Sequence, residues 1–118
     1  MPGPCAYPKS ERITRKREYL EVFEQGQKWV GRAVICYVVR REGQGRRCGV
    51  AVSRKVGSAV VRNRVKRYLK EIYRANRSRL VDDARIVIVA RPAAANLDYR
   101  QCVGAIQRLL EEGDVLSG

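Results

Sequence analysis

The spacing of hydrophobic residues changes several times along this sequence, and each change predicts a new element of secondary structure. Three segments carry apolar residues three and four positions apart, as amphipathic helices do, and these are residues 15–25, 58–77 and 98–112. Four shorter runs, rich in Val and Ile, predict β-strands at residues 28–30, 33–39, 46–53 and 84–90. The predicted order is therefore α-β-β-β-α-β-α.

Polar residues that can cap helices stand at the predicted helix ends. Thr14 and Ser58 are suited to N-cap the first and second helices, because a side-chain oxygen there can accept a hydrogen bond from a free backbone amide. Asp98, followed three residues later by Gln101, has the pattern of a capping box. Gly26 is expected to end the first helix.

The order of the elements predicts an α+β fold, a two-layer sandwich of helices packed on a mixed four-stranded sheet. The segment 42–45 contains two glycines, so we expect strands 33–39 and 46–53 to pair as an antiparallel hairpin. A helix separates strands 46–53 and 84–90, which implies a parallel pair joined by a βαβ crossover.

The domain organisation follows from length and composition. A chain of 118 residues suffices for one domain with one modest core. Residues 1–13 hold three of the four prolines and predict a flexible basic arm, followed by a single domain at residues 14–113 and a short tail at residues 114–118. No apolar run reaches the roughly 18 residues of a membrane span. The start of the chain lacks a hydrophobic signal segment, so we expect a soluble cytoplasmic protein that does not contact a membrane.

Positive charge is concentrated on the second predicted helix and the turn before it. The chain has 25 Lys and Arg against 12 acids, a net charge of +13. Residues 54–79 contain ten Lys or Arg and one acid, Glu71, which is +9 of that total. Helical geometry gathers Asn63, Lys66, Arg67 and Lys70 on one side, with Val65 and other apolar residues opposite. Such a face favours a polyanionic partner, nucleic acid above all.

Candidate catalytic chemistry is sparse in the sequence. It contains no His, the commonest general acid or base, and no phosphate-binding glycine motif. The cysteines are dispersed, and Cys36, Cys48 and Cys102 lie in apolar runs, so they are predicted core residues. Asp82 and Asp83 are adjacent in a predicted turn, where carboxylates are usually solvated. We therefore predict no catalytic residue and no metal site on the chain.

The strongest motif joins a strand, a glycine turn and the basic helix, and residues 49–67 read GVAVSRKVGSAVVRNRVKR. This segment resembles the signature of the bacterial ribonuclease P protein subunit. The resemblance extends from about Ile13 to Leu110, and it includes the segment YLEVF at residues 19–23 and the segment IVIVARP at residues 86–92.

The resemblance implies an activity as well as a fold. The family's β-α-β crossover is left-handed, against the usual right-handed preference. Its members assist the endonucleolytic removal of the 5′ leader from precursor tRNA. The catalytic centre lies in an RNA subunit that also holds Mg²⁺. The implied partners are that catalytic RNA and precursor tRNA, with no obligate protein partner.

The resemblance also assigns roles to residues of this chain. The residues expected to bind the RNA subunit are Arg54, Lys55, Arg62, Asn63, Arg64, Lys66, Arg67 and Lys70. Those expected to bind the single-stranded leader, in a cleft between the first helix and the sheet, are Tyr19, Phe23, Tyr37 and Ser53. From spacing alone, two aromatic residues four positions apart on one helix, as Tyr19 and Phe23 are, are more often core residues than a ligand-binding surface.

Two other functions fit a small basic protein of this kind. The first is a ribosomal or RNA-assembly protein without a nuclease role, which would use the same basic α+β surface. The second is a metal-dependent nuclease that acts alone. The signature in residues 53–67 favours the ribonuclease P protein over both, because the ribosomal reading would make that signature a coincidence.

Overall fold

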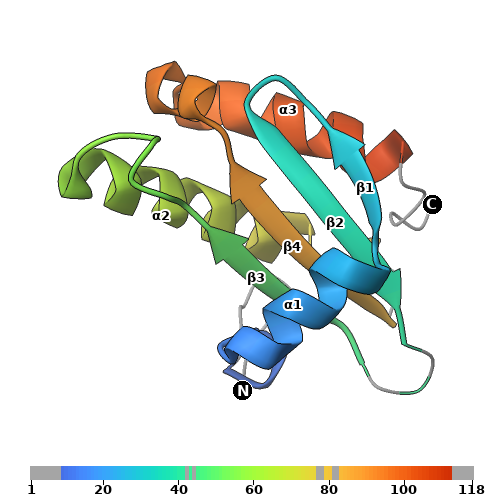
Figure 1. The fold of residues 1–118 in the computed structure, drawn as a ribbon. Coiled ribbons are helices and arrows are strands. Elements are labelled where there is room, and N and C mark those ends of the chain that lie inside the picture. Colours follow the sequence, from blue (N-terminus) through green and yellow to red (C-terminus); the bar gives the residue numbers. More distant parts are fainter. Residues whose placement is uncertain (1–8, 42, 44, 77–78, 81–82, 113–118) are drawn as a thin grey trace.

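The structure is a computed structural model that describes residues 9–41, 43, 45–76, 79–80 and 83–112 (Figure 1). Its elements in chain order are η1 (Lys9–Glu11), α1 (Lys16–Gln25), β1 (Gln27–Val30), β2 (Val34–Arg40), β3 (Arg47–Ala51), α2 (Ala59–Asn76), β4 (Ala84–Ala90), η3 (Pro92–Asn96) and α3 (Tyr99–Glu112). The predicted α+β fold with a mixed four-stranded sheet is confirmed. None of the described helices is both long enough and apolar enough to cross a membrane.

The strands lie in the order β1-β2-β4-β3. β1 pairs with β2 and β2 with β4 in antiparallel fashion, whereas β3 and β4 are parallel and are joined through α2, as predicted. The predicted hairpin between strands 33–39 and 46–53 is wrong, because β4 lies between β2 and β3. β4 is the strand with the most buried residues, because α2 and α3 cover one of its faces and α1 covers the other. The hand of the β3-α2-β4 crossover stays a prediction.

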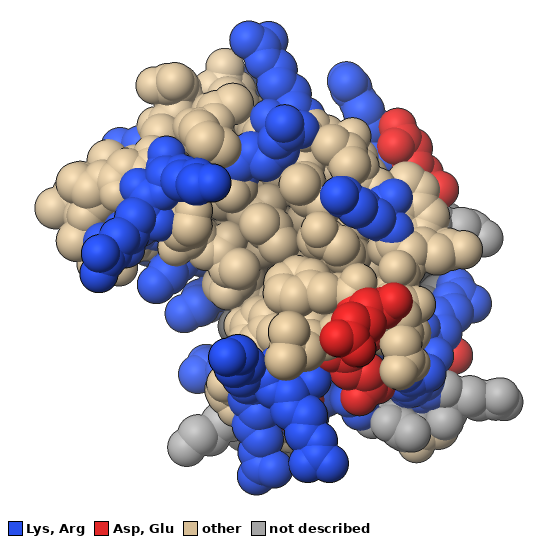
Figure 2. Space-filling model, in the orientation of Figure 1, with Lys and Arg blue, Asp and Glu red and all other residues tan. Residues whose placement is uncertain are grey.

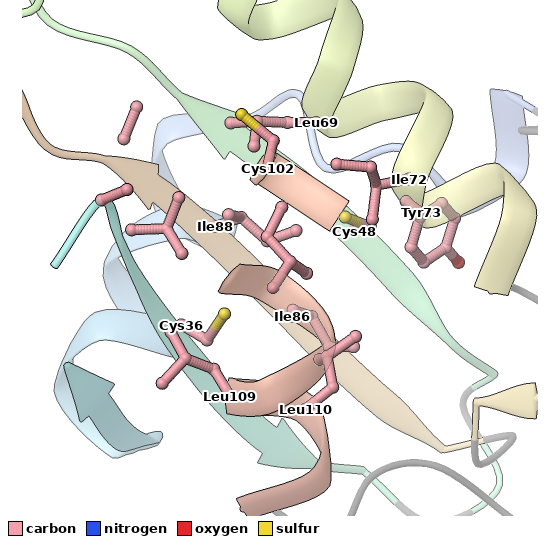
Figure 3. Packing of buried hydrophobic residues seen from close by; sticks show 14 of the residues in the cluster. Cys36, Cys48, Leu69, Ile72, Tyr73, Ile86, Ile88, Cys102, Leu109 and Leu110 are labelled. Atoms are coloured by element: carbon pink, nitrogen blue, oxygen red, sulfur yellow. The ribbon is translucent and has the colours of Figure 1, made fainter. Parts of the chain in front are cut away.

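Helices α2 and α3 cover one face of the sheet and enclose the main core (Figures 1 and 3). Leu69 and Ile72 of α2 and Ile106 of α3 are fully buried against Ile86 and other β4 residues. The three described cysteines, Cys36, Cys48 and Cys102, are also buried there as free thiols, which confirms them as core residues. Burial raises the pKa of the Cys36 thiol to about 12, so it remains protonated.

Helix α1 packs on the opposite face of the sheet and covers only part of it (Figure 1). Val22 is its one buried residue, and it meets Val87 of β4 and Ile13. Beyond this contact Val30 is 56% exposed, so apolar sheet surface reaches solvent beside α1. This partial cover distinguishes the α1 face from the closed core beneath α2 and α3.

Three of the four predicted helix caps are confirmed, since Ser58 and the pair of Asp98 and Gln101 cap α2 and α3, and Gly26 ends α1. The Val61 amide donates to Ser58 Oγ at 3.4 Å. The Gln101 amide donates to Asp98 Oδ1 at 2.8 Å, and the Asp98 amide donates to Gln101 Oε1 at 3.0 Å. Thr14 is not a cap: Arg15 is the N-cap residue of α1 and makes no side-chain cap bond. The start of α1 is fixed instead by tertiary contacts just before it.

Those contacts come from residues 9–13, which we call the strap. Arg12 forms a parallel bridge with Cys48 of β3, and the Ile13 amide donates to the Cys48 carbonyl at 2.9 Å. Ile13 is 4% exposed. The docked strap differs from the flexible arm expected over residues 1–13, of which residues 1–8 lie outside the described part of the chain.

Candidate nucleic-acid interface

The outer side of α2 carries most of the predicted RNA-binding residues. Val65, Leu69 and Ile72 face the sheet and are fully buried, so helical geometry turns the residues between them toward solvent. On that outer side Asn63, Arg67, Lys70 and Arg74 are exposed, and Arg62, Arg64 and Lys66 are half-buried. Figure 2 views the molecule from the side of α1 and shows Lys and Arg side chains over the visible part of α2 and around the amino end of α1, with acidic groups beside α1.

The acids near α1 neutralise arginines of the sheet. Glu21 pairs with Arg41 at 2.9 Å, and Glu18 pairs with Arg47 and lies 3.9 Å from Arg85. In contrast, no Lys or Arg of α2 forms an ion pair with any residue that the structure describes. Because like charges one turn apart repel, this arrangement destabilises an isolated helix and is suited to an anionic ligand.

Two arginines of α2 also make contacts within the protein. Arg64 donates from Nη2 to the Ala95 carbonyl of η3 at 2.7 Å and so ties α2 to the segment before α3. The Arg67 guanidinium lies 5.6 Å from the centre of the Tyr68 ring. Tyr68 in turn meets Tyr99 of α3 edge to face, with ring centres 5.7 Å apart. The predicted set therefore contains two arginines, Arg64 and Arg67, that also contact other residues of the protein.

The turn between β3 and α2 presents Ser53, Arg54 and Lys55 to solvent. The Val56 amide donates to the Ser53 carbonyl at 3.1 Å, and the Val56 side chain is buried, which fixes the turn. Gly57 follows with a φ of +155°, and a Cβ at this position would lie 3.1 Å from the Val61 side chain. A glycine is therefore required for the chain to enter α2 with the basic pair exposed.

The three predicted leader-binding aromatics come together on the α1 face of the sheet. The ring centres of Tyr19 and Phe23 are 6.3 Å apart, and Phe23 meets Tyr37 of β2 edge to face at 4.8 Å. Phe23 is 36% exposed, and Tyr19 and Tyr37 are half-buried. Lys28 of β1 lies with Nζ 5.8 Å from the Tyr37 ring centre. We call these four residues the aromatic cluster; it joins stacking surface to a positive charge.

Sequence reasoning did not identify Lys28 as part of this site. Its position depends on the register of β1 against β2, in which Lys28 stands opposite Tyr37. Cross-strand neighbours of this kind lie about 5 Å apart, within easy reach of a lysine. A short polar strand gives no periodic signal that would have fixed this register.

Tyr19 is held more firmly than the other rings. Its hydroxyl donates to the Val50 carbonyl at 3.3 Å, and burial is the main reason that its pKa is raised. The ring lies over Gly49 of β3 so closely that a Cβ there would come within 2.7 Å of it. Gly49 therefore makes room for the Tyr19 ring of the aromatic cluster. The sequence shows Gly49 as part of the 49–67 motif but does not indicate this contact.

This contact predicts the effect of a methyl group at residue 49. Gly49→Ala should displace the Tyr19 ring and lower the free energy of unfolding by at least about 1 kcal/mol, since overpacking forces neighbours from their preferred positions. Urea denaturation measures the loss. In a Tyr19→Ala background, where no ring blocks the methyl group, Gly49→Ala should cost clearly less. An equal cost in both backgrounds would show that the ring is not the obstacle.

The described residues contain no group of three or more His, Cys, Asp or Glu placed to hold a metal ion. Both surfaces carry groups suited to binding RNA: cations and an amide on α2, and aromatic rings with a lysine on the α1 face.

Comparison with known proteins gives one consistent family. A family model described as Ribonuclease P matches residues 7–113. The ribonuclease P protein component of Shouchella clausii is 34% identical over 110 residues, which cover 92% of this chain and 90% of that protein. The ribonuclease P protein component of Listeria monocytogenes is 33% identical over 109 residues, which cover 92% of each protein. A mutant RNase P protein of Staphylococcus aureus matches with a TM-score of 0.86 and 26% identity over 92% of both chains. The RNase P protein of Thermotoga maritima matches with a TM-score of 0.77 and 25% identity, covering 86% of the chain and 96% of itself.

Proposed function

This chain belongs to the ribonuclease P protein family, whose members are protein components of a tRNA-processing ribonuclease, and from that premise we propose that α2 binds the catalytic RNA subunit. The observation that carries the proposal is the concentration of cations on α2 without an acidic partner among the described residues. Arg and Lys on such a face neutralise phosphates and release condensed counterions. Asn63, exposed between two arginines, adds a donor and an acceptor for shape-specific contact.

The basic pair before α2 extends the same surface in this proposal. Arg54 and Lys55 are exposed on a turn that is fixed by buried Val56. They lie at the amino end of α2, where free backbone amides also favour anions. Contacts from the turn and from the helix together would follow several consecutive phosphates of the RNA subunit.

The aromatic cluster is our candidate for the site of the precursor-tRNA leader. Unpaired bases stack on aromatic rings regardless of sequence, and a nearby lysine can hold the backbone between them. Tyr19, Phe23 and Tyr37 offer ring surface on a partly open face, and Lys28 supplies the charge. Ser53, exposed just beyond the end of β3, would be a hydrogen-bonding neighbour.

In this proposal the catalytic centre and Mg²⁺ lie in the RNA subunit. The protein would then act on affinity: by neutralising phosphates on two polyanions it would reduce their repulsion and lower the magnesium concentration that cleavage requires. Arg64 and Lys66 would contribute to RNA binding, the former from a position that is also bonded to Ala95.

A reconstitution assay tests this function. Precursor tRNA is incubated with magnesium and the protein alone, the RNA subunit alone, or both. We expect no cleavage with the protein alone, slow cleavage with the RNA subunit, and faster cleavage at lower magnesium with both. Cleavage by the protein alone would show a nuclease that acts by itself. Absence of any stimulation would favour an RNA-assembly protein instead.

A further inference from the structure

The outer side of α2 is not an isolated helix face, because the strap lies beside it. Arg12 of the strap and residues of α2 line one common hollow. The charged residues of this hollow are Arg12, Lys66, Arg67, Lys70, Arg74 and Glu71. Five cations against one carboxylate give the hollow a net charge of +4, and Arg12 reaches it from a different part of the chain than the other cations do.

A buried carboxylate fastens the strap to α2. Glu11, next to Arg12, is 9% exposed and accepts a hydrogen bond of 2.6 Å from the Tyr73 hydroxyl of α2. Arg46 Nε lies 3.4 Å from the same Glu11 oxygen, and Arg46 also donates to the Leu80 carbonyl at 3.2 Å. Burial raises the pKa of Tyr73, and the bond to Glu11 raises it further, so the hydroxyl remains protonated and able to donate.

The backbone of the strap is also held by hydrogen bonds to β3. The Ile13 amide bonds to Cys48 of β3, and Arg47 donates from Nη2 to the Arg12 carbonyl at 3.1 Å. Because Glu11 and the Ile13 amide on either side of Arg12 are hydrogen-bonded, the Cα atom of Arg12 is held in place relative to α2. This prior fixing reduces the entropy that Arg12 would lose on binding a ligand.

We propose that this hollow is a two-walled phosphate-binding site for the RNA backbone, with Arg12 as a binding residue in one wall and the cations of α2 in the other. Glu11 and Tyr73 are positioning residues that hold Arg12 at its place. The inference rests on the proposed function, since it requires that α2 binds RNA. Opposed walls let donors reach one phosphate from two directions, which a single helix face cannot do.

A simpler explanation would give the strap only a structural role. The bridge from Arg12 to Cys48 covers the free edge of β3, and Ile13 fills space beneath α1. Loss of the Arg12 side chain would then leave RNA binding unchanged. The two explanations therefore differ in a quantity that can be measured.

The experiment measures binding of the catalytic RNA encoded in the same genome, transcribed and fluorescently labelled, over a salt titration. Arg12→Ala should weaken binding about tenfold, as expected when a charged hydrogen bond is lost. It should also lower the slope of log K against log salt by about one. Arg108→Ala removes an equal charge from an exposed position on α3 and is the matched control, with binding and slope expected to be unchanged.

Tyr73→Phe removes only the hydroxyl that fastens Glu11, and it tests positioning. Alone it should weaken binding about two- to fivefold, and in the Arg12→Ala background it should have no further effect, because coupled residues are not additive. Glu11→Gln should give the same result and serves if Tyr73→Phe fails to fold. Independent, additive losses would overturn the positioning role.

The outcomes separate this inference from the function on which it rests. If Arg12→Ala leaves affinity and slope unchanged while charge reversal on α2 abolishes binding, the two-walled site is overturned and the function stands. If neither change affects binding, both are overturned.

Discussion

Reversing two charges on α2, as in Lys66→Glu with Lys70→Glu, should weaken binding of the RNA subunit at least about 100-fold, since two phosphate contacts are lost and two repulsions replace them. The residues lie one turn apart, and both line the hollow beside the strap. The slope of log K against log salt should fall by about two. Equilibrium binding from about 50 to about 200 mM salt measures both quantities.

A matched variant on α3 distinguishes this surface from general basicity. Arg100→Glu with Arg108→Glu changes the net charge by the same amount at two exposed positions of another helix. The affinity of this variant for the RNA subunit should fall severalfold at low salt and approach that of the unaltered protein at high salt, because distant charges are screened. Equal losses in the two variants would contradict a specific role for α2. Thermal unfolding of each variant verifies that the fold is retained.

Several elements were predictable because one local signal dominated. β4 begins and ends at the predicted residues, and its near-continuous apolar composition indicates a strand buried on both faces. The same observation argues against the predicted hairpin: a strand that is apolar on both faces belongs at the centre of a sheet, where helices cover both faces, and β4 lies there between β2 and β3. Proximity in sequence predicts the hairpin, whereas burial favours a central place for β4.

The strap shows a different limit of sequence reasoning. Its residues have no period, and its position depends on a bond between Glu11 and Tyr73, which are 62 residues apart. A proline-rich start is typical of a flexible segment, yet one short stretch that pairs with a strand edge and buries Ile13 suffices to dock it. No pattern within residues 9–13 indicates this outcome.

The candidate site was predictable in composition but not in its contacts. Helical geometry placed the basic residues of α2 outward, and only the structure shows Arg64 bonded to Ala95 and Arg12 beside Lys66. On the other face, the four-residue spacing of Tyr19 and Phe23 places both on one side of α1. Their meeting with Tyr37 requires the docking angle of α1 on the sheet, which depends on Val22 and Val87.

The second large effect on RNA binding is expected at the aromatic cluster, and it should appear only for an RNA that carries a leader. Phe23→Ala should lower the affinity of the reconstituted enzyme for precursor tRNA with a long leader by about 10- to 100-fold, because stacking of one base contributes about 1–3 kcal/mol. Binding of mature tRNA, which lacks a leader, should be unchanged. Because the Phe23 ring also packs against Tyr37, thermal unfolding of the variant verifies that the fold is retained.

Leu20→Ala provides the control for this prediction, since Leu20 is another apolar residue of α1, is 45% exposed and has no aromatic ring. It should bind both RNAs as the unaltered protein does, and Phe23→Trp should retain most of the affinity for the leader because it preserves a stacking surface. A loss for Phe23→Ala that is equal with and without the leader would mean that the ring supports α1 rather than a base. The difference between the two RNAs, and not the loss itself, therefore measures what the aromatic cluster contributes to substrate binding.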